Sequence, residues 1–251
     1  MKAMDPSRLM AAAAFLLALS VPAHASKMDN RIVSSAKQSY VFRTYLRGDD
    51  IKIESKDGAV TLTGIVAEYF HKSLAQETVA DIPGVKSVDN RLELKGAPPT
   101  ANSDAWLRDK VKATLLFHRS VSAVKTEVDV KDGIVTLRGH AATQAQKELT
   151  AEYAKDIEGV KDVKNEMAVS KTSKKTRTAS QKIDDASITG QVKMALLLHR
   201  STSALNTTVA TKLGVVTVSG KARNEAEKAL VSKLIDDVNG VKSVTNRMTV
   251  E

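Results

Sequence analysis

The sequence predicts an α+β protein in which one unit, of the order αββαβ, occurs three times in tandem. Three observations predict it. A hairpin segment, a Gly-Val-Lys tripeptide and a later asparagine each occur three times, and offsets of 75 and 81 residues relate all of the copies. Within each copy, apolar residues recur first at helical spacing and then at alternate positions, and both patterns then recur in the same order. The hairpin segments are Lys56–Gly64, Lys131–Gly139 and Lys212–Gly220, the tripeptides begin at Gly84, Gly159 and Gly240, and the asparagines are Asn90, Asn165 and Asn246.

The first helix of each unit is predicted from apolar residues that lie three or four positions apart. The two strands after it alternate apolar and polar residues, and the Asp132-Gly133 pair between 126–130 and 134–137 indicates a hairpin turn. The helix positions are Leu107, Val111, Leu115 and His118 in the second unit, and Ile188, Val192, Leu196 and His199 in the third.

The second helix of each unit also has one apolar face, formed in the third unit by Ala226, Leu230, Leu234 and Val238. It is predicted to end at the glycine of the tripeptide, because glycine adopts the left-handed conformation at little cost. A last alternating strand closes the unit. We therefore expect a three-stranded mixed sheet with both helices on one face and a right-handed crossover from the second strand to the third.

The first 25 residues are predicted to be a cleaved export signal. Lys2 and Arg8 supply positive charge, residues 9–19 form an apolar run, and Ala23-His24-Ala25 fits the small-x-small cleavage pattern. The mature chain is therefore expected in the periplasm. The predicted divisions are the signal peptide 1–25, unit 1 at 27–95, a proline-containing linker 96–103, unit 2 at 104–170, a basic linker 171–182 and unit 3 at 183–251.

Taken together, the repeated segments resemble the BON domain, a bacterial module of osmotic-stress and outer-membrane-maintenance proteins. The resemblance rests on the Gly-x-Val-Thr-Leu-x-Gly hairpin, as in 133–139, the amphipathic helix after it, and Gly-Val-Lys-x-Val-x-Asn, as in 159–165. It covers nearly all of the chain after residue 25 and implies phospholipid binding. The family pattern usually has Asp-Pro after the first helix, whereas this chain has His118-Arg119-Ser120 and His199-Arg200-Ser201 at that point.

Composition and motifs predict no catalytic activity, no cofactor and no metal site. The chain has no cysteine, which excludes disulfides, thiolate metal sites and a lipid-modified N-terminal cysteine. It also lacks a nucleophile elbow, a phosphate-binding loop and a zinc-protease motif. Asp57 and Asp132 correspond to Leu213 in the third unit, which a turn tolerates and a shared catalytic acid would not. His118 and His199 lack a second ligand at metal-binding spacing, so we expect them to complement helix dipoles.

The formal net charge of +9 lies mainly outside the repeated units. The segment from Lys171 to Lys182 contains five basic residues and no acidic one, so the units themselves are nearly neutral. Aromatic residues make up only 4% of the chain, which predicts aliphatic cores and argues against nucleic-acid binding. The basic segment is interpreted either as a solvated tether or as a contact with an anionic lipid surface.

The first helix has more apolar surface than one small sheet can cover. Residues 40–42, 115–117 and 196–198 are apolar runs at equivalent positions that spread over about 200° of the helix, and Arg43, Arg119 or Arg200 follows closely. Such a patch suits a phospholipid, and burial against a neighbouring unit is the alternative. The predicted lipid-contact residues are Leu116, Phe117, Arg119, Leu197, Leu198 and Arg200, with Lys174, Lys175 and Arg177 of the basic linker.

The sequence thus predicts a non-enzymatic periplasmic protein of envelope stress or envelope maintenance that binds anionic phospholipid membrane surfaces peripherally. The alternative is a periplasmic protein-interaction or chaperone-like module that binds partner or unfolding proteins. The two predictions differ in their salt dependence, because membrane binding through the basic linker weakens as salt screens the charges.

Overall fold

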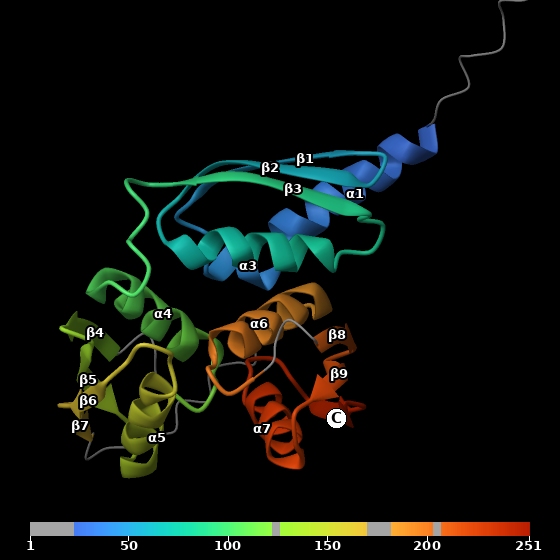
Figure 1. Ribbon diagram of the computed structural model, residues 1–251. Helices are drawn as coiled ribbons and strands as arrows, with labels where there is room; N and C mark the ends of the chain where they lie inside the picture. Colours follow the sequence, from blue (N-terminus) through green and yellow to red (C-terminus); the bar gives the residue numbers. More distant parts are fainter. Residues whose placement is uncertain (1–22, 122–125, 170–181, 203–206) are drawn as a thin grey trace, which may run out of the picture.

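The computed structural model describes residues 23–121, 126–169, 182–202 and 207–251, and over these residues it contains the three predicted units (Figure 1). Unit 1 consists of α1 (Ala23–Gln38), α2 (Tyr40–Thr44), β1 (Asp50–Lys56), β2 (Ala59–Val66), α3 (Tyr69–Ala80) and β3 (Ser87–Leu94). Unit 2 consists of α4 (Asp104–Phe117), β4 (Thr126–Lys131), β5 (Ile134–Ala141), α5 (Gln144–Lys155), β6 (Asp162–Asn165) and β7 (Ala168–Val169). Unit 3 consists of α6 (Asp185–Leu198), β8 (Thr207–Lys212), β9 (Val215–Ala222), α7 (Glu225–Asp236), β10 (Ser243–Asn246) and β11 (Thr249–Val250).

The second strand of each unit is the central strand of a mixed sheet, as predicted. β2 pairs antiparallel with β1 and parallel with β3, and the strands of units 2 and 3 pair in the same way. In units 2 and 3 the last strand is divided into two short pieces, and both pieces pair with the central strand. The sheets therefore have the predicted order, with one break that the sequence pattern does not indicate.

The repeated asparagine joins the last strand to the second helix. The side-chain amide of Asn90 donates a hydrogen bond of 2.8 Å to the carbonyl oxygen of Lys72 on α3. The corresponding bonds run from Asn165 to Lys147 at 2.6 Å and from Asn246 to Lys228 at 2.9 Å. Because the bond occurs at the same place in all three units, the repetition of this residue has a structural explanation.

A carboxylate from the first helix fixes the hairpin turn of each unit. In unit 1, Asp29 accepts the backbone N–H groups of Asp57 and Gly58 at 2.9 and 3.0 Å. Asp104 and Asp185 bind the turns of units 2 and 3 in the same way. Asp57 and Gly58 have φ angles of 53° and 84°, the left-handed pair of a type I′ turn. The sequence predicts this turn from its Asp-Gly pair, but it does not predict the carboxylate that holds it.

In unit 1 the first helix is broken at Ser39, and this break connects unit 1 to unit 3. The Ser39 hydroxyl caps α2 by accepting the N–H of Phe42 at 3.4 Å. The backbone N–H groups that follow the break donate to unit 3: Tyr40 to Asp184 at 2.7 Å and Val41 to Ser187 at 3.0 Å. The break therefore makes two backbone donors available for a contact between units.

Each unit has its own hydrophobic core, and the core of unit 1 extends onto helices of the other two units. Unit 1 lies across the first helices of the other two units, so that α3 faces α4 and α6 (Figure 1). Phe117 of α4 and Leu198 of α6 belong to the same buried cluster as the core of unit 1. The Phe117 ring lies edge-on to Tyr45 and Phe70, at centroid distances of 5.9 and 6.2 Å. The prediction of purely aliphatic cores is therefore wrong at this junction, where several of the few aromatic residues gather.

Helices α3 and α6 pack closely against each other at Gly190. A Cβ atom at this position would lie 2.5 Å from the Thr78 side-chain oxygen, so only glycine fits without a shift. One turn further along α6, Lys193 forms a 2.8 Å ion pair with Glu77. Among the described residues, no helix is both long enough and apolar enough to cross a membrane.

Candidate membrane-contact surface

The structure separates the four apolar side chains that the sequence predicts to contact lipid. Phe117 and Leu198 are buried in the core shared with unit 1, and Leu116 packs partly buried against the same core. Leu197 is 51% exposed. Of the four, Leu197 is the one that the described arrangement leaves open to a bilayer.

Both candidate arginines form ion pairs across the contact between units 2 and 3. Arg119 of unit 2 lies 3.0 Å from the Asp236 carboxylate and also donates to the Val241 carbonyl oxygen at 3.2 Å. Arg200 of unit 3 lies 3.5 Å from the Asp156 carboxylate. Their side chains remain nearly half exposed, so each guanidinium is accessible to solvent while already paired.

Units 2 and 3 contact each other through equivalent positions, in the manner of a two-fold dimer. The backbone N–H of Arg119 donates to the carbonyl oxygen of Asp237, and that of Arg200 donates to Asp156, at 2.8 and 3.3 Å. The offset of 81 that relates the repeats converts one of these bonds into the other. A contact in which residue i meets j and j meets i is the signature of an isologous interface. The repeat has therefore produced an internal pseudo-dimer.

His118 and His199 are buried in this interface, each opposite an acid of the other unit. His118 Nδ1 lies 3.4 Å from Asp237, and His199 Nε2 lies 3.4 Å from Asp156. Burial lowers the pKa of His199, and Asp156 opposes that shift only in part. The sequence predicts both residues in the last turn of the helix, whereas each follows its helix in an extended conformation and faces a carboxylate of the other unit, of which the sequence gives no sign.

The two histidine sites are not identical, because their neighbours differ. Tyr153 stacks on His118 with a ring separation of 4.0 Å and donates a 2.6 Å hydrogen bond to Asp237. Unit 3 has Leu234 at the position that corresponds to Tyr153. Although burial raises the pKa of Asp237, its contacts with His118, Ser120 and Tyr153 hold that pKa below the usual range. Polar contacts are therefore denser at the His118 end of the interface.

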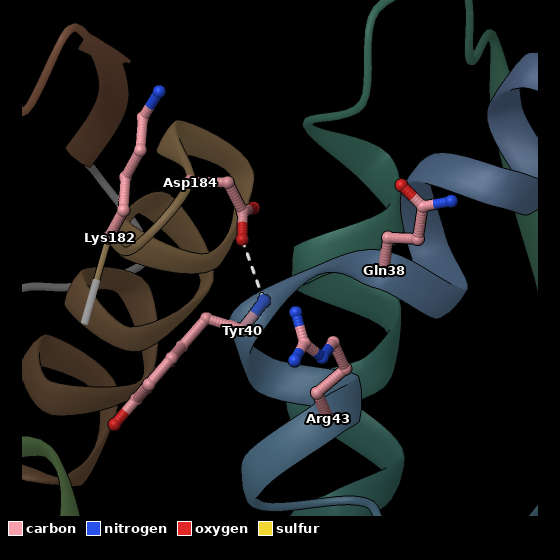
Figure 2. A pocket seen from close by; sticks show the side chains of 5 residues that line it. All are labelled: Gln38, Tyr40, Arg43, Lys182 and Asp184. Carbon is pink, nitrogen blue, oxygen red and sulfur yellow. Dashed lines mark hydrogen bonds between the residues drawn. The ribbon is translucent and has the colours of Figure 1, made fainter.

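The end of the first helix in unit 1 faces solvent and lines two grooves. The smaller groove, of about 160 Å³, contains the hydrogen bond from Tyr40 to Asp184, and Figure 2 shows Arg43 and Lys182 on opposite sides of this bond. The larger groove, of about 480 Å³, also contains Arg43, together with Lys37 and Arg47. The sequence places Arg43 beside the apolar run 40–42, but it does not show that Lys37 and Arg47 line the same groove. The missed signal is the cluster of cations around it.

The linker cations Lys174, Lys175 and Arg177 lie outside the described residues, as does nearly all of the predicted signal peptide. Within the described ranges, no group of three or more His, Asp or Glu residues is arranged to hold a metal ion. The surface in these ranges carries exposed cations and the exposed Leu197, and several acids are engaged in contacts between units.

The fold defines the chain as a tandem-repeat protein of three αββαβ domains. The chain belongs to the BON domain family, because the model of that family matches residues 28–96, 103–171 and 184–251. The resemblance read from the repeats is thus confirmed.

The chain is also similar in sequence to two named proteins. It is 30% identical over 143 residues to Osmotically-inducible protein Y of Escherichia coli (strain K12), an alignment that covers 55% of this chain and 71% of that protein. It is 32% identical over 111 residues to the outer membrane lipoprotein DolP of Haemophilus influenzae, covering 43% of this chain and 57% of that protein. A solved structure of CdsD, a structural protein of the type III secretion system of Chlamydia trachomatis, aligns with 16% identity over 88% of this chain and 92% of that one. Its TM-score of 0.25 is too low to support an argument.

Proposed function

We propose that this chain is a periplasmic protein of envelope stress or envelope maintenance that binds anionic phospholipid surfaces peripherally and catalyses no reaction. Two relatives support the setting, since one is osmotically inducible by name and the other is an outer membrane lipoprotein. The function proposed is adhesion to a lipid surface through charge and a small apolar contact.

The observation that carries the proposal is the position of the positive charge. Five basic residues and no acidic one lie between Lys171 and Lys182, which joins two nearly neutral domains. Each Lys or Arg near an anionic membrane contributes about 1 kcal/mol, so five contribute at most about 5 kcal/mol, or a dissociation constant of about 0.2 mM. Such binding is reversible and sensitive to salt, as a peripheral protein requires.

The apolar part of the contact is assigned to the end of α6. Leu197 is 51% exposed there, close to Arg200, whose exposed ion pair with Asp156 is worth little because solvent screens it. Phe117 and Leu198 can reach lipid only if unit 1 moves away from α4 and α6. The proposed contact therefore consists of Leu197, the two arginines and the linker cations, which lie outside the described residues.

The test is co-sedimentation of residues 26–251 with vesicles of phosphatidylglycerol and phosphatidylcholine, against phosphatidylcholine alone, at about 0.01 and about 1 M salt. We expect binding to the anionic vesicles that weakens strongly with salt. Replacing Lys174, Lys175 and Arg177 by Gln should reduce it. Replacing three exposed lysines of unit 2, Lys131, Lys155 and Lys164, by Gln is the control with the same change in net charge. Failure of the unmodified chain to sediment with anionic lipid would contradict the proposal.

The apolar contribution has its own matched pair of variants. Leu197→Ser should reduce the fraction of binding that persists in high salt, because it removes an apolar side chain from the lipid contact. Leu213→Ser removes an even more exposed leucine, at 74%, from a turn at another place in unit 3. Equal effects of the two substitutions would show that Leu197 has no particular place in the contact.

A further inference from the structure

Three cations surround the larger groove of unit 1, which we call the unit-1 groove and define by Lys37, Phe42, Arg43, Leu46, Arg47 and Ile51. Lys37 is near the end of α1, Arg43 is on α2, and Arg47 follows α2. Within the described ranges, none of the three side chains forms an ion pair or a hydrogen bond, and both arginines are exposed. Their charges are therefore available to an anion from outside the chain.

The acid that lines the same groove does not neutralise them. Asp49 has only 1% of its side chain exposed. One of its oxygens accepts the N–H of Ala67 at 2.8 Å, and the other lies 2.7 Å from His71 Nδ1. Its carboxylate thus faces inward, and the rim of the groove is positively charged.

The floor of the groove is apolar. Leu46 is buried in the core of unit 1, and Phe42 and Ile51 pack partly exposed against that core. A free phosphate ion makes no favourable contact with apolar side chains, whereas a phospholipid presents a phosphate together with hydrocarbon. The combination of unpaired cations and partly exposed apolar side chains matches that chemistry.

The basic linker ends beside the same place. Lys182 is its last residue and lies across the smaller groove from Arg43, which lines both grooves (Figure 2). The corresponding helix ends of units 2 and 3 are instead engaged with each other, since Arg119 and Arg200 are both paired with acids. Charge complementarity to an anionic surface is therefore most complete at unit 1.

We propose that the unit-1 groove is a binding site for the phosphate headgroup of an anionic phospholipid, and that this end of unit 1 faces the membrane. The site rests on the proposed function, because it takes its ligand from the same lipid surface. It adds a location on a folded domain to a contact otherwise assigned to the linker and α6.

The test compares two triple variants that lose the same net charge: Lys37→Gln, Arg43→Gln and Arg47→Gln in the groove, and Lys131→Gln, Lys155→Gln and Lys164→Gln on unit 2. Since each cation near an anionic surface contributes about fivefold in affinity, we expect the groove variant to bind anionic vesicles about a hundredfold more weakly. The unit 2 variant should stay within about threefold of the unmodified chain. Circular dichroism and urea unfolding check that both variants fold.

The outcomes separate the two proposals. If the unmodified chain binds vesicles and the groove variant binds them equally well, the groove proposal is overturned and the proposed function stands. Equal losses in both variants would also overturn it, since only total charge would then matter. No vesicle binding by the unmodified chain would overturn both. Titration with inorganic phosphate and with glycerol 3-phosphate tests the ligand: binding of these anions at the groove without an effect of the groove variant on vesicles would exclude a lipid.

Discussion

The end of the first helix occurs three times in this chain, and it has one role in units 2 and 3 and another in unit 1. In units 2 and 3 the residue after the helix is a histidine, buried against a carboxylate of the other unit. At the corresponding position in unit 1 stands Arg43, which is exposed and lines two grooves. The helix before it is continuous in units 2 and 3 and broken at Ser39 in unit 1.

The difference shows how repeats of one domain divide their functions. Units 2 and 3 pair with each other through the ends of their first helices, and unit 1 covers the apolar faces of those helices. Covering those helices occupies the sides of α2 and α3 in unit 1 and leaves its own cationic end free. The pairing engages Arg119 and Arg200 with acids, whereas Arg43 of unit 1 has no such partner among the described residues.

The largest effect is expected where unit 1 covers unit 2. Phe117→Ala should lower the free energy of unfolding by about 3–5 kcal/mol, because the ring is fully buried among side chains of both units. Phe42 holds the corresponding position in unit 1 and is partly exposed, so Phe42→Ala should cost less than half as much. Urea unfolding of the two variants measures the contrast. Equal losses would mean that the two helix ends are equally covered.

A smaller effect tests how closely unit 1 fits unit 3. In Gly190→Ala the new Cβ meets Thr78, and this overpacking should lower the free energy of unfolding by about 1–3 kcal/mol. The higher helix propensity of alanine offsets about 1 kcal/mol of that loss. Small-angle scattering should show a larger radius of gyration as unit 1 moves away. Gly48→Ala is the control, since a Cβ there meets no atom within 4 Å. A Gly190→Ala variant that is as compact as the original chain and more stable than it would contradict the packing described.

The hairpin turns offer a prediction with opposite signs in two units. Leu213 has a φ angle of 54° and is exposed, an unfavourable state for a bulky residue, whereas Asp132 tolerates the same angle in unit 2. Leu213→Asn should therefore stabilise the chain by about 1 kcal/mol, and Asp132→Leu should destabilise it by a similar amount. Thermal unfolding of both variants checks this. A destabilising Leu213→Asn would show that the leucine makes a contact that offsets its strain.

The smallest effect expected is a fall in stability at acidic pH, caused by His199 at the interface between units 2 and 3. His199 faces Asp156, Arg200 and His118, and burial lowers its pKa below the ordinary value of 6.5. The unfolded chain therefore binds more protons than the folded chain just below pH 6.5, and His199 makes stability fall as the pH falls through this window. We expect His199→Gln to flatten the dependence of the urea midpoint on pH between about 7.5 and about 5.5. His140→Gln, at an exposed histidine, should leave it unchanged.

The sequence predicts the fold of each unit because the same pattern can be compared across three copies. Three copies of the Asp-Gly or Leu-Gly turn, the terminal glycine and the asparagine place each element at the same position. The helix break at Ser39 is not predicted, since it depends on the acceptors Asp184 and Ser187, which lie far along the chain. Local patterns thus determine the units, and contacts between units determine the exception.

The candidate site is predicted less completely, for a related physical reason. An apolar residue beside an arginine looks the same in the sequence whether it contacts lipid or another domain, yet Phe117 is buried against unit 1 and Leu197 is exposed. The acids Asp156 and Asp237 are equivalent by the offset of 81, yet the pattern does not show that they meet the histidines. The sequence places Arg43 beside an apolar run, but only the fold brings Lys37 and Arg47 to the same groove.

The most direct test asks which end of the molecule touches lipid. The chain contains no cysteine, so one introduced cysteine carries an environment-sensitive dye at a single place. Gly48→Cys puts the dye beside the unit-1 groove without removing a cation, and Lys164→Cys puts it on the sheet of unit 2. With phosphatidylglycerol vesicles, we predict that the emission of the dye at position 48 shifts to the blue and that the emission at position 164 does not change. A shift at position 164 with none at position 48 would contradict the account.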